Sequence, residues 1–206
     1  KEEMVILISH LGYIKRIPAT AYKSQNRGGK GSNSVNLAED DFLDQIFTAS
    51  THDYIMFITN AGKAYWLKVH EIQEASRTSR GSHIKSLLSV SSDEEITAVV
   101  SLKEFDDKTY LLMATAGGVV KKVTTDNFAN AKTRGIIAIK LDEGDKLVSA
   151  ILTGGKDEIM LITRRGQALR TSEEDIRSQG RSSRGVTGIK LSSEDELTGA
   201  LRVTEN

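Results

Sequence analysis

The stretch Tyr-Ile-Met-Phe-Ile-Thr-Asn-Ala-Gly at Tyr54–Gly62 decides the fold. It is a short apolar run followed by a Ser/Thr-x-x-Gly turn, and the same pairing occurs four times in the 206 residues. Short runs of β-branched and aromatic residues bounded by turn residues predict strands, and glycine supplies the positive φ of a tight turn. The other copies are Met4–Ile8 with Ser9…Gly12, Tyr110–Ala114 with Thr115…Gly118, and Ile159–Ile162 with Thr163…Gly166.

A second glycine, always preceded by a basic residue, follows each turn in step. The paired glycines lie 19, 19, 17 and 19 residues apart, and the second glycines recur at intervals of 50, 54 and 50. Two markers that keep register over four units indicate an internal repeat. The four basic–glycine pairs are Lys30-Gly31, Arg80-Gly81, Arg134-Gly135 and Arg184-Gly185.

Each unit then continues in the same order, with a short strand, an acidic turn and a final strand. The predicted short strands are Val35–Leu37, Ile84–Leu88, Ile136–Leu141 and Val186–Leu191, and the predicted final strands are Gln45–Ala49, Ile96–Leu102, Leu147–Leu152 and Leu197–Val203. Helical turns are expected only before the second glycine, as at Val69–Ala75 and Asp175–Ser178. Four strands in about 50 residues is the size of a propeller blade. We therefore expect an all-β, propeller-like fold with blades at approximately 1–50, 51–103, 104–153 and 154–206.

The composition suits a globular domain, with 38% hydrophobic and 27% charged residues. The absence of cysteine excludes disulfides and thiolate metal sites and favours the reducing cytoplasm. No apolar run approaches the roughly 18 residues that span a bilayer, and the start carries no signal-peptide pattern. The sequence predicts a cytoplasmic protein with no membrane partner.

The net charge of zero conceals a charge pattern in register with the repeat. Residues 11–31 hold five basic and no acidic residues, 63–85 five and two, 119–140 five and one, and 164–190 seven and three. The segments between them are acidic, at −5, −4, −3 and −3 for 36–58, 86–109, 141–159 and 191–206. In a radial array, equivalent segments occupy equivalent places, so the basic segments are expected on one surface. Such a surface is suited to a polyanion.

The basic loops share the pattern basic–one or two residues–basic–glycine. Small residues let backbone N–H groups approach phosphate oxygens, while arginine can bind two oxygens at once. Nothing in the pattern suggests side chains that read bases in the major groove. We expect a sequence-tolerant, backbone-dominated contact with a polyanion. The candidate DNA-binding residues are Lys15, Arg16, Gln25, Arg27, Gly28, Gly29, Lys30, Gly31, Arg77, Arg80, Lys121, Lys122, Lys132, Arg134, Arg170, Arg181 and Arg184.

One loop, Gln25-Asn26-Arg27-Gly28-Gly29-Lys30-Gly31, resembles the gyrase A box. That motif reads Gln-Arg-Arg-Gly-Gly-Lys-Gly and is the hallmark of the C-terminal domain of the DNA gyrase A protein. Six of its seven positions match, and Asn26 replaces the second-position cation. The surroundings also resemble the family, and the resemblance covers the whole chain. The supporting segments are Met4–Gly12 with Tyr13-Ile14-Lys15-Arg16, then Thr51-His52-Asp53 and Met113-Ala114-Thr115-Ala116.

The resemblance implies a β-pinwheel, a propeller relative whose blades exchange a strand with their neighbours. It implies that duplex DNA wraps around a basic rim, so that the holoenzyme introduces negative supercoils with ATP. It also implies two protein partners, the N-terminal breakage-reunion domain of the same gyrase A protein and the gyrase B protein, in an A2B2 complex associated with the nucleoid. The catalytic tyrosine and the ATPase would lie outside this chain, and the isolated domain would be monomeric. Family members usually have six units, so four imply a fragment or a shortened form.

Three alternatives are weighed against this prediction. An enzyme is disfavoured because Gly28-Gly29-Lys30-Gly31-Ser32 departs from a P-loop, no G-x-S-x-G occurs, and the four histidines are dispersed. We expect no catalytic residue, cofactor or metal. A protein-binding propeller would use exposed aromatics, yet aromatics are 5% of the chain. The equivalent domain of topoisomerase IV usually lacks an intact box, whereas this loop is nearly complete.

Overall fold

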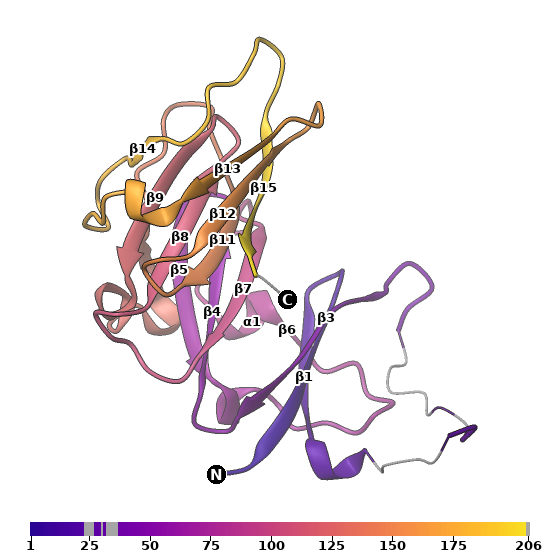
Figure 1. Ribbon diagram of the computed structural model, residues 1–206. Helices are drawn as coiled ribbons and strands as arrows, with labels where there is room; N and C mark the ends of the chain where they lie inside the picture. The colour runs from indigo at the N-terminus through magenta and orange to yellow at the C-terminus, as the bar shows by residue number, and fades with distance from the viewer. Residues whose placement is uncertain (23–26, 30, 32–36, 205–206) are drawn as a thin grey trace. The chain divides into compact units, whose positions relative to one another are not determined.

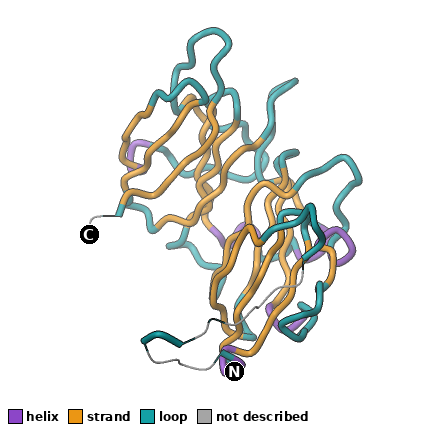
Figure 2. Tube along the Cα trace, turned by 90° about the vertical axis from the view of Figure 1, so that its right-hand side faces the viewer, coloured by secondary structure: helices purple, strands orange, loops and turns teal. Residues whose placement is uncertain are grey.

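The computed structural model describes residues 1–22, 27–29, 31 and 37–204, and strands dominate it (Figures 1 and 2). This confirms the all-β prediction. The strands are β1 (Glu3–Ser9), β2 (Tyr13–Pro18), β3 (Leu43–Ser50), β4 (Tyr54–Thr59), β5 (Lys63–Lys68), β6 (Ser82–His83), β7 (Ile96–Leu102), β8 (Tyr110–Thr115), β9 (Val119–Thr124), β10 (Ile136–Ile137), β11 (Leu147–Thr153), β12 (Glu158–Thr163), β13 (Ala168–Ser172), β14 (Val186–Thr187) and β15 (Leu197–Val203). Short helical elements are η1 (Ala19–Ala21), η2 (Val69–Glu71), α1 (Ile84–Leu87), η3 (Thr125–Phe128), η4 (Lys132–Arg134) and η5 (Glu173–Asp175).

The short strands are the least accurate part of the sequence prediction. The strand predicted at Ile84–Leu88 is wrong, because β6 ends at His83 and the helical turn α1 follows it. The ring of His83 accepts a hydrogen bond from the amide of Lys85 at 3.2 Å and caps this turn. The other two described short strands, β10 and β14, keep only two residues each. The segment Val35–Leu37 lies mostly outside the described residues.

The Ser/Thr-x-x-Gly turn has the same geometry in all four copies. In each, the glycine amide donates to the Ser/Thr carbonyl at 3.0 Å, and the glycine φ lies between +78° and +89°. The Ser/Thr hydroxyl also accepts a hydrogen bond from the backbone amide of the residue after the glycine. The motif therefore needs a hydroxyl at its first position and a residue without a Cβ at its last.

Repeats are joined by exchange of the short strand. The sheets have the orders β3-β1-β2-β6, β10-β5-β4-β7, β11-β8-β9-β14 and β13-β12-β15. The short strand of the second repeat, β6, thus completes the sheet of the first, where Ile14 pairs with Ser82. Likewise β10 joins β5, and β14 joins β9, beside which it is labelled in Figure 1. The strand exchange that the resemblance implies is therefore present. In the described part of the chain, the fourth sheet has no exchanged strand.

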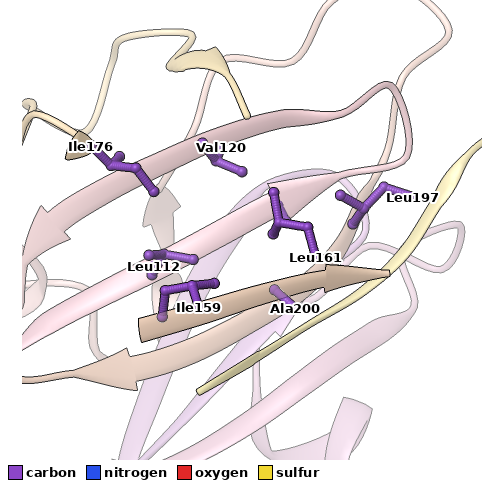
Figure 3. Packing of buried hydrophobic residues seen from close by; sticks show 8 residues of the cluster. Leu112, Val120, Ile159, Leu161, Ile176, Leu197 and Ala200 are labelled. Carbon is purple, nitrogen blue, oxygen red and sulfur yellow. The ribbon is translucent and has the colours of Figure 1, made fainter. Parts of the chain in front are cut away.

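The chain divides into two compact units. The first comprises residues 1–55 and 67–89, and the second comprises 56–66 and 90–206. In the second unit, β11 packs on β7 and on β15. Figure 3 shows its apolar core, in which Leu112 and Val120 meet Ile159, Leu161 and Leu197.

Burial along each strand reflects whether one or both of its faces are covered. On β8, residues Leu111, Leu112, Met113 and Ala114 are all fully buried, which means that both faces of the strand are covered. On β12 burial alternates along Glu158–Thr163, because this strand has one covered face. Burying each large apolar side chain contributes about 1.5–3 kcal/mol.

Candidate nucleic-acid interface

Two of the four basic loops have the same conformation. They are Arg77–Gly81 in the first unit and Arg181–Gly185 in the second. Gly81 has a φ of +85°, and Gly185 has a φ of +97°. A Cβ at either glycine would collide with a backbone carbonyl of the preceding repeat, that of Ile14 or Val120. The glycines thus allow each loop to lie against the second strand of the repeat before it.

Each of these loops holds one half-buried arginine and one exposed arginine. The half-buried Arg77 donates to the carbonyl of Ala21 at 2.7 Å, and Arg181 donates to that of Ile137 at 3.1 Å. The exposed Arg80 lies 3.8 Å from the centroid of the Tyr13 ring. Stacking of this kind occupies the face of the guanidinium and turns its N–H edge outward, and the charge of Arg80 acts on the nearby carboxylate of Asp41.

Arg184, the exposed arginine of the fourth repeat, is paired with an acidic turn. Its guanidinium Nε donates to both carboxylate oxygens of Asp142 at 2.7 Å. The hydrogen bond and charge of Asp142 raise the pKa of Arg184, and the same guanidinium lowers the pKa of Asp142. Asp142 therefore occupies the edge of Arg184 that a phosphate would bind.

The third loop is built differently. Lys132 and Arg134 are exposed and belong to the 3₁₀ turn η4, in which Lys132 has a φ of +46°. Gly135 closes this loop by donating from its amide to the carbonyl of Ala131 at 2.9 Å. A side chain at Gly135 would collide with the ring of Tyr65.

The first loop, which carries the gyrase A box, is described in part. Arg27, Gly28, Gly29 and Gly31 are exposed, and Gly28 has a φ of +89°. Gln25 and Lys30 lie outside the described residues.

The structure places four of the five remaining predicted residues inside or between repeats. Lys15, Lys121 and Lys122 are buried, with 2%, 1% and 5% of their surface exposed. Arg16, whose side chain is 15% exposed, donates to the carbonyl of Ile72 at 2.7 Å and pairs with Glu74 at 2.9 Å. The burial of Lys15, Lys121 and Lys122 leaves their ammonium groups inside the protein, where they hold the following repeat, whereas contact of Arg16 with DNA stays a prediction. Arg170 is exposed and pairs with Glu158 at 3.0 Å.

The sequence identified the acidic turns only by their charge and indicated no function for them. The carboxylates of Asp41, Asp145 and Asp195 accept hydrogen bonds from turn amides 28 to 30 residues earlier, those of Leu11, Gly117 and Arg165, at 2.9–3.1 Å. The acidic turn of each of these repeats therefore caps its own Ser/Thr-x-x-Gly turn. Their recurrence opposite each turn is the signal that could have revealed this function.

Neither a metal centre nor a membrane span is found in the residues that the structure describes. No three His, Asp or Glu side chains gather there in a way that could hold a metal ion. No helix there is long and apolar enough to cross a membrane.

Fold and loops together define a β-propeller relative whose repeats exchange a short strand and present a basic loop just before it. The family model for the DNA gyrase C-terminal domain, β-propeller, matches residues 3–50, 53–103, 109–153 and 157–204. The chain belongs to this family.

Individual relatives agree with the family assignment. The chain is 70% identical over 183 residues to the DNA gyrase A protein of Treponema pallidum (strain Nichols), which covers 89% of the chain and 22% of that protein. It is 42% identical over 197 residues to the DNA gyrase A protein of Klebsiella oxytoca, covering 96% of the chain and 22% of that protein. The chain thus spans about a fifth of the length of these relatives.

Solved structures of such domains share the fold. A DNA gyrase A C-terminal domain matches with a TM-score of 0.76 and 31% identity, over 100% of this chain and 66% of that one. The C-terminal domain of a DNA topoisomerase IV matches with a TM-score of 0.84 and 26% identity, over 99% of this chain and 62% of that one.

Proposed function

We propose that this chain binds duplex DNA through its basic loops and wraps it around a basic rim, without reading base sequence. The observation that carries the proposal is the repeated loop, in which a glycine at positive φ follows an exposed arginine at Arg80 and again at Arg184. Loops of this kind bring cations and backbone amides to phosphates. The family supports the choice of DNA as the polyanion.

In this proposal the chain serves a DNA gyrase and performs no chemistry itself. Its partners are the breakage-reunion domain of the same gyrase A protein and the gyrase B protein in an A2B2 enzyme, whose ATP-dependent reaction introduces negative supercoils in the cytoplasm. The similarity to about a fifth of the gyrase A protein supports this context.

Energetically, the contacts must offset the bending of the duplex. Bending 20–30 base pairs by 40–90° costs on the order of 1–6 kcal/mol. Binding that neutralises several phosphates releases counterions and supplies a free energy that depends strongly on salt. Loops on successive repeats can provide such contacts along one duplex.

Salt-dependent binding tests this proposal. A duplex of arbitrary sequence is titrated with the 206-residue chain at salt concentrations from about 50 to 200 mM. If about six to ten phosphates are neutralised, affinity falls roughly 10³–10⁵-fold across this range. A second duplex of unrelated sequence should give the same curve. A nearly flat salt response, or strong preference for one sequence, would contradict the proposal.

A further inference from the structure

Lys15 is a buried cation that holds the loop of the following repeat. It is 2% exposed, and its ammonium donates to the carbonyls of Ser76, Arg77 and Ser79 at 3.2, 2.7 and 2.8 Å. These carbonyls belong to the segment that forms the basic loop Arg77–Gly81. An ammonium has three donors and no acceptor, so the curled carbonyls fit its chemistry.

Lys121 repeats this arrangement in the second unit. It is 1% exposed and donates to the carbonyls of Arg181 and Ser183, the latter at 2.9 Å, and to that of Ala138 at 2.9 Å. Arg181 and Ser183 occupy the positions of Arg77 and Ser79 in the shared loop pattern. The same two carbonyls of the loop are therefore turned inward in both units.

Inward carbonyls determine where the loop amides point. In a planar trans peptide the C=O and the following N–H point in opposite directions, and none of the described peptides is cis. The amides of Thr78 and Arg80 therefore point away from Lys15, and those of Ser182 and Arg184 point away from Lys121. Within the described residues, no hydrogen bond occupies these four amides. The amides between them, those of Ser79 and Ser183, donate instead to the carbonyls of Ser76 and Gly180 at 3.3 Å. Exposed backbone amides such as those of Thr78 and Arg80 can donate to phosphate oxygens.

The second repeat is a natural contrast. Tyr65 stands at the equivalent position, three residues after the turn glycine, and donates from its hydroxyl to Glu94 at 3.1 Å. The loop that follows is the 3₁₀ turn η4, with Gly135 against the Tyr65 ring. Where the lysine is absent, the loop takes another conformation.

We propose that Lys15 and Lys121 are positioning residues for DNA binding, which aim the amides and arginines of the loops Arg77–Gly81 and Arg181–Gly185 at DNA phosphates without touching DNA themselves. This inference rests on the proposed function. Burial lowers the pKa of both lysines, that of Lys121 to about 8, with the charge of Arg181 contributing. Each side chain nevertheless donates to three carbonyls, as an ammonium does. A neutral side chain would leave inward carbonyls without a donor, and the loop would turn away.

The test compares the salt dependence of DNA binding among three variants of the 206-residue chain. Each phosphate contact made by a cation contributes about 0.9 to the slope of log affinity against log salt. The double variant Arg77→Ala, Arg80→Ala should lower this slope by roughly one to two such contacts, because Arg77 also donates to the carbonyl of Ala21. Lys15→Met should lower it by a similar amount, although Lys15 is buried, and adding it to the double variant should lower it no further. The control is Lys156→Met, which removes one exposed charge outside the loops.

Each result has a distinct meaning. If the double variant keeps the wild-type slope, the proposed DNA contact of this loop fails. If it lowers the slope while Lys15→Met does not, or if Lys156→Met lowers it equally, the positioning inference is overturned. Partial unfolding would reduce affinity by one factor at all salt concentrations and leave the slope unchanged. If Lys15→Met does not fold, the same comparison of salt slopes is made in the second unit, between Lys121→Met and the double variant Arg181→Ala, Arg184→Ala. Failure of both lysine variants to fold would also overturn the inference.

Discussion

Three glycines of the second unit form a graded test of the loop architecture. Gly185 has a φ of +97°, and a Cβ there would lie 2.5 Å from the carbonyl oxygen of Val120 and 3.1 Å from the Cβ of Lys121. Gly166 has a φ of +82° with nothing within 4 Å of that position. Gly180 has neither the left-handed backbone nor a close neighbour. Substitution by alanine therefore separates conformational strain from collision.

The expected losses of unfolding free energy follow from these differences. A left-handed backbone costs a residue with a Cβ about 1–2 kcal/mol, which is the expectation for Gly166→Ala. Collision with a backbone carbonyl adds about 1–3 kcal/mol, as overpacking does, so Gly185→Ala should lose about 2–5 kcal/mol in total. Gly180→Ala should be neutral or stabilising by up to about 1 kcal/mol, because alanine reduces the entropy of the unfolded chain.

Urea unfolding followed by circular dichroism measures the three losses on one scale. The order should be Gly185→Ala, then Gly166→Ala, then Gly180→Ala. If Gly185→Ala is no more destabilising than Gly166→Ala, the close approach of this loop to β9 would be refuted.

Four further predictions concern buried and paired side chains. Glu173 is fully buried, lies 3.9 Å from the Lys122 ammonium and accepts from the amides of Gly155 and Asp157 at 2.6 and 2.8 Å. Glu173→Gln should therefore cost about 3–5 kcal/mol in urea unfolding, as breaking a buried pair does, and a loss below about 1 kcal/mol would contradict this. Asp142→Asn should raise DNA affinity measured by fluorescence anisotropy, because it releases Arg184; unchanged or weaker binding would count against a phosphate site there. Arg184 also lowers the pKa of Asp142 below its ordinary 3.8. The pair therefore stabilises the folded wild type above that pH, and this stabilisation is lost as the pH falls through the lower pKa of the folded state. Asp142→Asn should remove this part of the decrease in unfolding free energy at acidic pH. Burial and Glu94 raise the pKa of Tyr65 to about 12. An ultraviolet titration should therefore show one tyrosine that ionises at unusually high pH, and Tyr65→Phe should remove this step.

The repeat and the long strands could be predicted because their signals are local. β7 (Ile96–Leu102) and β15 (Leu197–Val203) have the predicted bounds, since apolar runs there end at turn residues. The prediction of a strand at Ile84–Leu88 failed because its buried residues Ile84 and Leu88 lie four positions apart, which is a helical spacing. The sequence alone offered no measure of how His83 would cap this turn.

The candidate site was less predictable, because charge alone does not determine exposure. In the sequence, Lys15 and Lys121 cannot be distinguished from lysines on the surface. Their ammonium groups are bound by carbonyls of loops that lie 60 or more residues later in the chain, and only the fold brings these groups together. The loop arginines were predictable because the basic–glycine pattern recurs in register. The exposure of Arg80, Arg134 and Arg184 agrees with that pattern, while their contact with DNA stays a prediction.

The most direct measurement of the central claim is the linking number of a nicked plasmid that is ligated on the chain and then freed of protein. Wrapping of DNA around the basic loops predicts a shift in linking number that grows with the amount of bound chain. The shift should disappear when Arg27, Arg80 and Arg184 are replaced by alanine, and it should persist in Lys156→Met. An unshifted linking number at saturating chain would contradict the proposal that this domain wraps DNA.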